Sequence, residues 1–310
     1  LSLVSDLNRI GLSIPEVGWS KPAASRGTLR AEVSLGPVPR VDRLELQAAG
    51  LEAKGSVTMR AAGGLDLARF ERVTLDGWLD GAVEIKGRGA GKDVALAVTG
   101  GSVDMRRMPD ASARKSSGRG GVPISLRLDR LRVTDSISFD GFAGEFSQSG
   151  GLHGDFTASL NGQAPLRGTV VPSPQGSAVR LSANDAGATL AAAGVFSSAR
   201  GGALELQLTP RDANGTYDGI AKLTNIRVKN ASVLAELLNA VSVVGLLEQL
   251  NGAGIVFNQA EAEFLLTPAA VQVQRGSAIG ASLGVSMAGV YQSGSGALAM
   301  QGVVSPIYLL

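Results

Sequence analysis

Hydrophobic and polar residues alternate along much of this chain of 310 residues. In RLELQ (43–47), for example, Leu44 and Leu46 alternate with charged or amide side chains. A period of two gives a β-strand one apolar and one polar face. The same pattern predicts strands in six segments: 43–61, 72–87, 93–105, 124–133, 203–210 and 270–276.

Turn-forming residues separate these segments at short intervals. Examples are AAGG at 61–64, GRGAGK at 87–92, VPSPQG at 171–176 and ANG at 213–215. Short strands joined by such turns are typical of antiparallel meanders. The spacing between turns is irregular, which argues against a β-helix or propeller with a fixed repeat. We therefore predict a mainly β fold with a long antiparallel, curled sheet that forms an apolar groove.

Two segments have helical spacing instead. In LSLVSDLNRIG (1–11), Leu3, Leu7 and Ile10 recur at helical intervals and Gly11 is a possible stop, so a short helix is predicted. The second segment is SVLAELLNAVSVVGLLEQLNGAGIVF (232–257). Between its two glutamates it has only 11 uncharged residues, whereas a membrane span needs about 20 apolar residues. A membrane span is therefore not predicted here, and a helix that lies flat at a membrane interface stays an alternative.

This second segment carries two apolar stripes. The step from residue 241 to 243 turns an α-helix by roughly 200°, so the stripes lie on nearly opposite faces of a straight helix. Either the helix is apolar all round, or it is kinked near 242–245 and both halves face one core. We predict a short kinked helix or helix pair that acts as a cap or a gate, with candidate contact residues Leu234, Leu237, Leu238, Val241, Val243, Leu246, Leu247 and Leu250.

Composition and charge exclude some functions. The chain has 29 basic and 27 acidic residues and only 4% aromatic residues, which gives little support for nucleic-acid binding. It has no cysteine, so disulfides and thiolate-bound metals are excluded. The densest basic stretch, RKSSGRGG (114–121), is predicted to be a solvated loop, with contact to acidic lipid headgroups as the alternative.

No motif predicts an active site. GASLG (280–284) fits the nucleophile motif G-x-S-x-G, but His153, the single histidine, precedes it and cannot follow it as that motif requires. GRGAGK (87–92) is one residue too short for a phosphate loop and lacks its hydroxyl residue. One histidine cannot build a usual metal site. We expect no catalytic residue, metal or cofactor, and we interpret the scattered aspartates as solvated charges.

Several longer segments resemble a known family. VTGGSVDMRRMPD (98–110), DAGATLAAAGVFSSARGGALELQL (185–208) and 218–268 are similar to the C-terminal region of AsmA-like bacterial envelope proteins, in the YhdP-like branch. GSAIGASLGVSMAGVYQSGSGALAMQGVVSPIYLL (276–310) continues the similarity. The resemblance is strong from about residue 180 onward and looser over 40–180.

The resemblance implies a periplasmic protein anchored to the inner membrane by a segment outside this sequence. It implies a bridge-like β-groove that conducts phospholipid acyl chains between the inner and outer membranes, with possible envelope protein partners. No cofactor and no catalytic residue follow from it. The candidate groove-lining residues are the inward members of the alternating strands, namely Leu44, Leu46, Val94, Leu96, Val98, Leu126, Leu128, Leu204, Leu206 and Leu208.

The chain is accordingly divided into three regions. Residues 1–40 are a lead-in segment with the possible short helix, 41–210 are the repetitive antiparallel β-groove region, and 211–310 are the AsmA-like C-terminal region with helical segment 231–250. The alternation alone leaves an alternative open, because it would also build a dry core. In that case the chain would be a non-catalytic envelope scaffold or an accessory subunit of a membrane complex.

Overall fold

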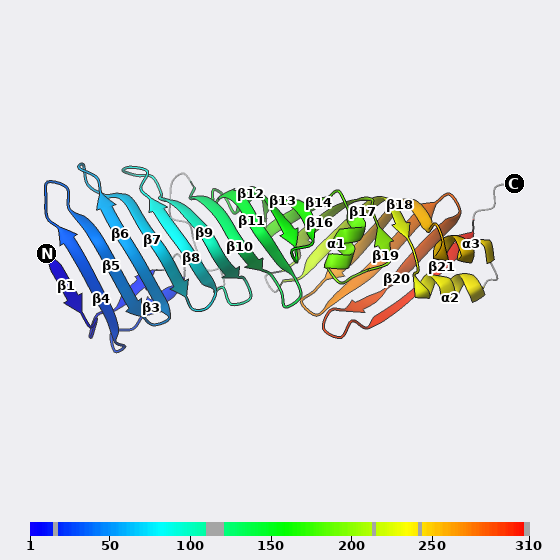
Figure 1. The fold of residues 1–310 in the computed structure, drawn as a ribbon, viewed down its shortest axis with the longest axis horizontal. Coiled ribbons are helices and arrows are strands. Elements are labelled where there is room, and N and C mark those ends of the chain that lie inside the picture. The colour runs from blue at the N-terminus through cyan, green and yellow to red at the C-terminus, as the bar shows by residue number, and fades with distance from the viewer. Residues whose placement is uncertain (15–17, 110–120, 213–214, 241–243, 307–310) are drawn as a thin grey trace. The chain divides into compact units, whose positions relative to one another are not determined.

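The structure is a computed structural model that describes residues 1–310 except 15–17, 110–120, 213–214, 241–243 and 307–310. The chain forms two compact units, Leu1–Phe156 (unit 1) and Thr157–Leu310 (unit 2). A sheet of 19 strands, which does not close on itself, contains nearly all the strands (Figure 1). The prediction of a mainly β fold with a long antiparallel sheet and a helix pair near the C-terminus is confirmed.

Unit 1 consists of strands in the described residues. Strand β1 pairs with β4, and from β4 to β9 each strand pairs antiparallel with the next. Strands β2 and β3 form a separate two-stranded sheet. The strands are β1 (Ser2–Ser5), β2 (Leu12–Ile14), β3 (Trp19–Lys21), β4 (Gly27–Ser34), β5 (Arg40–Ala48), β6 (Leu51–Met59), β7 (Leu65–Leu75), β8 (Leu79–Lys86), β9 (Ala95–Asp104), β10 (Pro123–Arg132), β11 (Ser138–Ser147) and the first part of β12 (His153–Leu160).

Unit 2 adds three short helices to the meander. Strands β13, β14, β16 and β17 to β21 are consecutive neighbours, and the short β15 pairs with β17. The elements are β13 (Ala164–Ser173), β14 (Gly176–Ala183), α1 (Ala186–Ala192), β15 (Ala199–Arg200), β16 (Ala203–Pro210), β17 (Tyr217–Val228), α2 (Ser232–Ala240), α3 (Val244–Asn251), β18 (Ile255–Leu266), β19 (Ala270–Gly280), β20 (Leu283–Gln292) and β21 (Leu298–Pro306).

The six segments predicted as strands lie on strands of the structure, and their registers align the apolar positions. In unit 1 one row of directly opposed residues runs across β4 to β11 on a single face of the sheet. It contains Ala31, Leu44, Gly55, Phe70, Val83, Val98, Leu126 and Gly144. Because strand side chains alternate between faces, the neighbouring polar positions lie on the opposite face.

The same alignment occurs in unit 2. One apolar row crosses β14 to β21 and contains Leu181, Leu206, Ala221, Ala262, Gly276, Met287 and Gly302. Beside it, Phe264 on β18 lies over Gly219 of β17, where a Cβ atom would come within 2.2 Å of the ring. The missing side chain at Gly219 thus makes room for an aromatic ring on the apolar face.

The helix predicted within residues 1–11 is wrong. Ser2–Ser5 is strand β1, and Leu7 has a φ of 51°, which ends any right-handed helix. Tertiary contacts override the helical spacing here. The ammonium group of Lys21, which is 1% exposed, donates hydrogen bonds to the carbonyls of Leu7 (2.8 Å), Ile10 (2.9 Å) and Ser25 (2.5 Å) and so fixes this segment as a loop.

One parallel strand pair interrupts the antiparallel order and was not predicted. Strand β10 pairs parallel with β9, with Leu126 opposite Val98. A parallel pair requires the chain to return from the end of β9 to the start of β10. Most of that connection lies outside the described residues, and so does nearly all of the basic stretch 114–121.

Candidate functional site

The structure places most of the predicted groove residues on one face of each unit. In unit 1, Leu44, Val98 and Leu126 lie in the row described above, and Leu46 and Leu96 lie in the apolar rows on either side of it. In unit 2, Leu206 is opposite Leu181 and Ala221, while Leu204 and Leu208 occupy the two adjacent apolar rows. The alternation therefore identified a shared face correctly.

Exposure separates these residues into two kinds. Six are only half-buried and so remain partly accessible to solvent: Leu44, Leu46, Leu96, Leu126, Leu206 and Leu208. In contrast, Val98, Leu128 and Leu204 are 6%, 3% and 7% exposed and are enclosed by neighbouring side chains. Val94 precedes β9 and is 37% exposed, so it lies outside the paired strands.

An incompletely covered apolar face is unusual for a dry core, where side chains are fully enclosed. Complete burial of a Leu side chain stabilises the folded state by roughly 1.5–3 kcal/mol, and a half-buried Leu contributes only part of this free energy. Extended apolar patches of this kind mark interaction or ligand-binding surfaces. This face is therefore the candidate functional site of each unit.

The opposite face of the sheet is lined with charged pairs. In unit 1, Arg72 of β7 donates to Asp80 of β8 at 2.9 Å, and Arg69 forms an ion pair with Glu84 at 2.6 Å. In unit 2, Lys222 and Glu261 are directly opposite each other at 3.6 Å. Such pairs contribute little stability when exposed, but they keep this face solvated.

Hydrogen bonds from arginine lower the pKa of Glu45, Asp80 and Asp104 on unit 1. Arg72 lowers the pKa of Asp80, and Arg106 lowers the pKa of Asp104 to about 2. Arg106 also bonds to Asp135, so this arginine joins two carboxylates at the ends of β9 and β10. Asp80 and Asp104 are thus bound as ionised partners of arginines.

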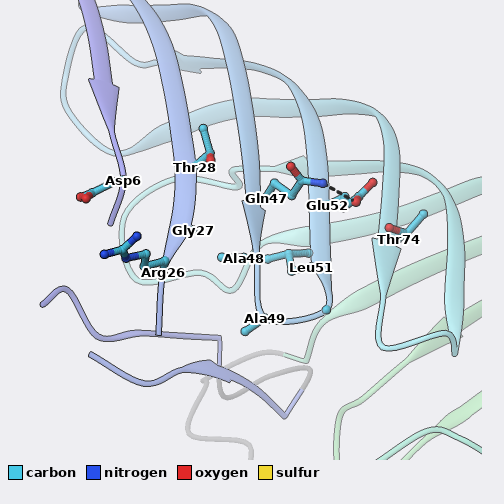
Figure 2. A pocket seen from close by; sticks show the side chains of 11 residues that line it. Asp6, Arg26, Gly27, Thr28, Gln47, Ala48, Ala49, Leu51, Glu52 and Thr74 are labelled. Atoms are coloured by element: carbon cyan, nitrogen blue, oxygen red, sulfur yellow. Dashed lines mark hydrogen bonds between the residues drawn. The ribbon is translucent and has the colours of Figure 1, made fainter. Parts of the chain in front are cut away.

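A cavity of about 640 Å³ on unit 1 lies near the turn that joins β5 to β6 (Figure 2). Its walls include Thr28, Gln47, Glu52 and Thr74, which are direct register partners on β4 to β7. Gln47 donates a hydrogen bond to Glu52 at 2.7 Å, as Figure 2 shows. The lining also includes Ala48 and Leu51, which belong to the apolar row nearest the turn between β5 and β6, so the cavity lies at the end of these strands and away from the row of Leu44 and Leu126.

Helix α1 crosses part of the apolar face in unit 2. It contacts β13, β15 and β17 (Figure 1), and it starts at Asp185, whose carboxylate accepts a hydrogen bond from the Ala188 amide at 2.8 Å. The hydroxyl group of Tyr291, on β20, donates to the carbonyl of Gly194 at 3.3 Å, just beyond α1. Tyr291 belongs to an apolar row, so α1 ends on the apolar side of the sheet.

The helix pair α2–α3 lies at one end of this face. The predicted break between the two apolar stripes falls between Ala240 and Val244, the end of α2 and the start of α3. Leu238 and Leu250 are fully buried, and α3 contacts β18. Of the other predicted contact residues, Leu234, Leu246 and Leu247 are half-buried, Val241 and Val243 lie outside the described residues, and the side chain of Leu237 is likewise not described.

The weak catalytic motifs have non-catalytic structures. Gly280 ends β19 and Leu283 begins β20, so GASLG forms a turn between two antiparallel strands and lacks the following helix of a nucleophile elbow. Within the described part of the chain, no group of three or more histidine or carboxylate residues could hold a metal ion. No helix of that part is long and apolar enough to cross a bilayer.

Comparisons of the chain with protein-family models, with curated proteins and with solved structures found no match.

Proposed function

We propose that this chain is a segment of a periplasmic, inner-membrane-anchored protein that shields phospholipid acyl chains and conducts them between two membranes. The observation that supports this most is the apolar face, which runs across the strands of each unit and leaves residues such as Leu126 and Leu206 half-buried. The periplasmic location, the anchor and the two membranes come from the AsmA-like resemblance alone.

Acyl chains suit such a surface chemically. The rows combine Leu, Val, Ala and Gly with few polar atoms, so they need no specific hydrogen bond to hold a ligand. Burial of acyl methylenes is favourable by about 0.8 kcal/mol each, independently of their position along a row. A lipid can therefore change its position along the face at little cost, and transfer requires no cofactor.

A charge placed on this face tests the proposal. Leu206→Asp introduces a carboxylate among half-buried apolar side chains, and Gln207→Asp places the same group on the polar face of the same strand. Leu206 is preferable to Leu204, which is enclosed, because an aspartate at 204 would also disrupt the fold. Native mass spectrometry and lipid extraction of the purified proteins measure bound phospholipid.

We expect the wild-type protein and Gln207→Asp to retain phospholipid and Leu206→Asp to lose most of it while keeping its β-sheet circular dichroism. Transfer of a fluorescent phospholipid between vesicles should fall in parallel. A wild-type protein that purifies without lipid and transfers none would contradict the proposal and favour the dry scaffold or accessory subunit.

A further inference from the structure

Two arginines face each other on the polar side of unit 2. Arg200 of β15 is directly opposite Arg227 of β17, and Lys229 follows just beyond the end of β17. Like charges directly opposite in an antiparallel pair are destabilising. Elsewhere in unit 2 the corresponding positions carry opposite charges, as for Lys222 with Glu261, so this pair departs from the pattern of its own face.

The three basic groups lack an acidic partner within the described residues, where every ion pair of unit 2 lies at other positions. Arg200 donates to the carbonyls of Ser197 (2.5 Å) and Ala199 (2.6 Å), and Arg227 donates to that of Ala253 (2.8 Å). A guanidinium group has five N–H donors. These backbone contacts therefore orient both groups and leave further donors for an anion.

The aliphatic parts of the Lys229 and Arg227 side chains meet at Gly254. Gly254 has a φ of 89°, and a Cβ at this position would lie 2.6 Å from Cγ of Lys229 and 2.9 Å from Cγ of Arg227. Because glycine has no side chain, the two basic side chains converge over it. Val228, between them in sequence, is buried on the other side and pairs with Ile255, at the end of the face where α2–α3 lies.

We infer that Arg200, Arg227 and Lys229 form a binding site for the phosphate of a phospholipid headgroup. A phosphate would accept charge-assisted hydrogen bonds from both guanidinium groups and offset their mutual repulsion. The assignment of this phosphate to a lipid rests on the proposed function, whereas the phosphate chemistry rests on the three side chains alone.

Two soluble probes test the site in the full chain. Isothermal titration calorimetry would use inorganic phosphate and, separately, dihexanoyl-phosphatidylglycerol below its micelle concentration. The test variant is Arg200→Gln/Arg227→Gln. The matched control is Lys222→Gln/Arg275→Gln, which removes the same charge from ion-paired positions on the same face.

We expect the wild-type protein and the control to bind the short-chain lipid with dissociation constants that agree within about twofold. The test variant should bind the lipid at least tenfold more weakly. The loss of one charge-assisted hydrogen bond costs a free energy that corresponds to roughly a tenfold increase in the dissociation constant. Thermal unfolding gives a second readout, because phosphate should raise the melting temperature of the wild type and the control but not that of the test variant.

Three results would overturn the inference. If the test and control variants bind the short-chain lipid equally weakly, the attraction comes from the overall charge of the protein and not from a specific site. If the wild-type protein binds neither probe, the site does not exist. Binding of inorganic phosphate without the lipid would overturn the headgroup assignment. The failure of this inference can be distinguished from the failure of the proposed function, because neither probe has long acyl chains. If the probes bind through the arginines but the purified protein carries no phospholipid on its apolar face, the anion site stands and the acyl-chain proposal is refuted.

Discussion

Unit 1 and unit 2 are built from the same two-faced strands but differ in what covers the apolar face. In unit 1 the described residues form strands and connecting loops, and rows such as that of Leu44 and Leu126 have no helix above them. In unit 2 the connection between β14 and β15 supplies α1, and the connection between β17 and β18 supplies α2 and α3. Alternation thus builds the face, and insertions between strands determine where it is covered.

The polar faces differ as well. On unit 1 several arginines form ion pairs with carboxylates of the next strand, as for Arg69 with Glu84 and Arg130 with Asp140. The like-charged neighbours Lys54 and Arg72 are each paired with a carboxylate, Glu45 and Asp80. On unit 2 the short strand β15 sets Arg200 opposite Arg227. The same insertion that carries α1 therefore creates both the partial cover and a like-charged pair that has no acidic partner among the described residues.

The largest effect should come from charges on the two apolar faces. If both units hold acyl chains, Leu126→Asp in unit 1 and Leu206→Asp in unit 2 should each remove most of the bound phospholipid, measured by native mass spectrometry. Arg127→Asp and Gln207→Asp, on the opposite face, are the matched controls. Loss of lipid from one variant alone would restrict the function to that unit.

The next largest effect concerns the helix pair. Leu250→Ala removes a fully buried side chain and should lower the free energy of unfolding by about 2–5 kcal/mol, measured by urea denaturation. Leu126→Ala, at a half-buried position on the uncovered face, should cost clearly less. Equal losses would mean that the face of unit 1 is as enclosed as the helix contact of unit 2.

A smaller effect is expected at the hydrogen bond between Tyr291 and Gly194. Tyr291→Phe removes the hydroxyl group and should destabilise the contact by about 0.5–1.5 kcal/mol. Hydrogen exchange of the α1 amides should become faster while exchange in unit 1 is unchanged. Unchanged exchange in α1 would show that this bond does not hold the helix on the apolar face.

The smallest effect is a pH dependence in unit 1. Arg106 lowers the pKa of Asp104 from 3.8 to about 2, so the stability gained from this contact is fully present above about pH 4. It is lost as the pH falls through 2, when the carboxylate of the folded protein becomes protonated. Unfolding measured between pH 5 and 2 should therefore show a shallower loss of stability in Arg106→Gln than in the wild type. Parallel curves would contradict this assignment.

The sequence predicted the two faces and the helix pair, but not helix α1. The side chains of Leu44, Val98 and Leu126 share a face through alternation alone, yet their alignment in one row depends on registers and bulges such as that between Phe70 and Val73. The break between α2 and α3 followed from the offset of two apolar stripes. Both features are encoded in short-range spacing, which sequence analysis detects.

Features that depend on distant strands were missed. Helix α1 had a detectable signal, since Asp185 precedes a run of small helix-forming residues, but its position over β17 has none. The meeting of Arg200 with Arg227 depends on how β15 returns to β17 after that helix. The enclosure of Leu204 is likewise set by neighbours in three dimensions and so was not visible in the alternation.

Site-specific photo-crosslinking tests the central claim most directly. A benzophenone amino acid would replace Leu126 or Leu206 on the apolar face, or Arg127 or Gln207 on the polar face, in cells that produce the protein. The proposed function predicts crosslinks to phospholipid at positions 126 and 206 and none above background at 127 and 207. Absence of lipid crosslinks at both apolar positions, or equal labelling of the two faces, would contradict it.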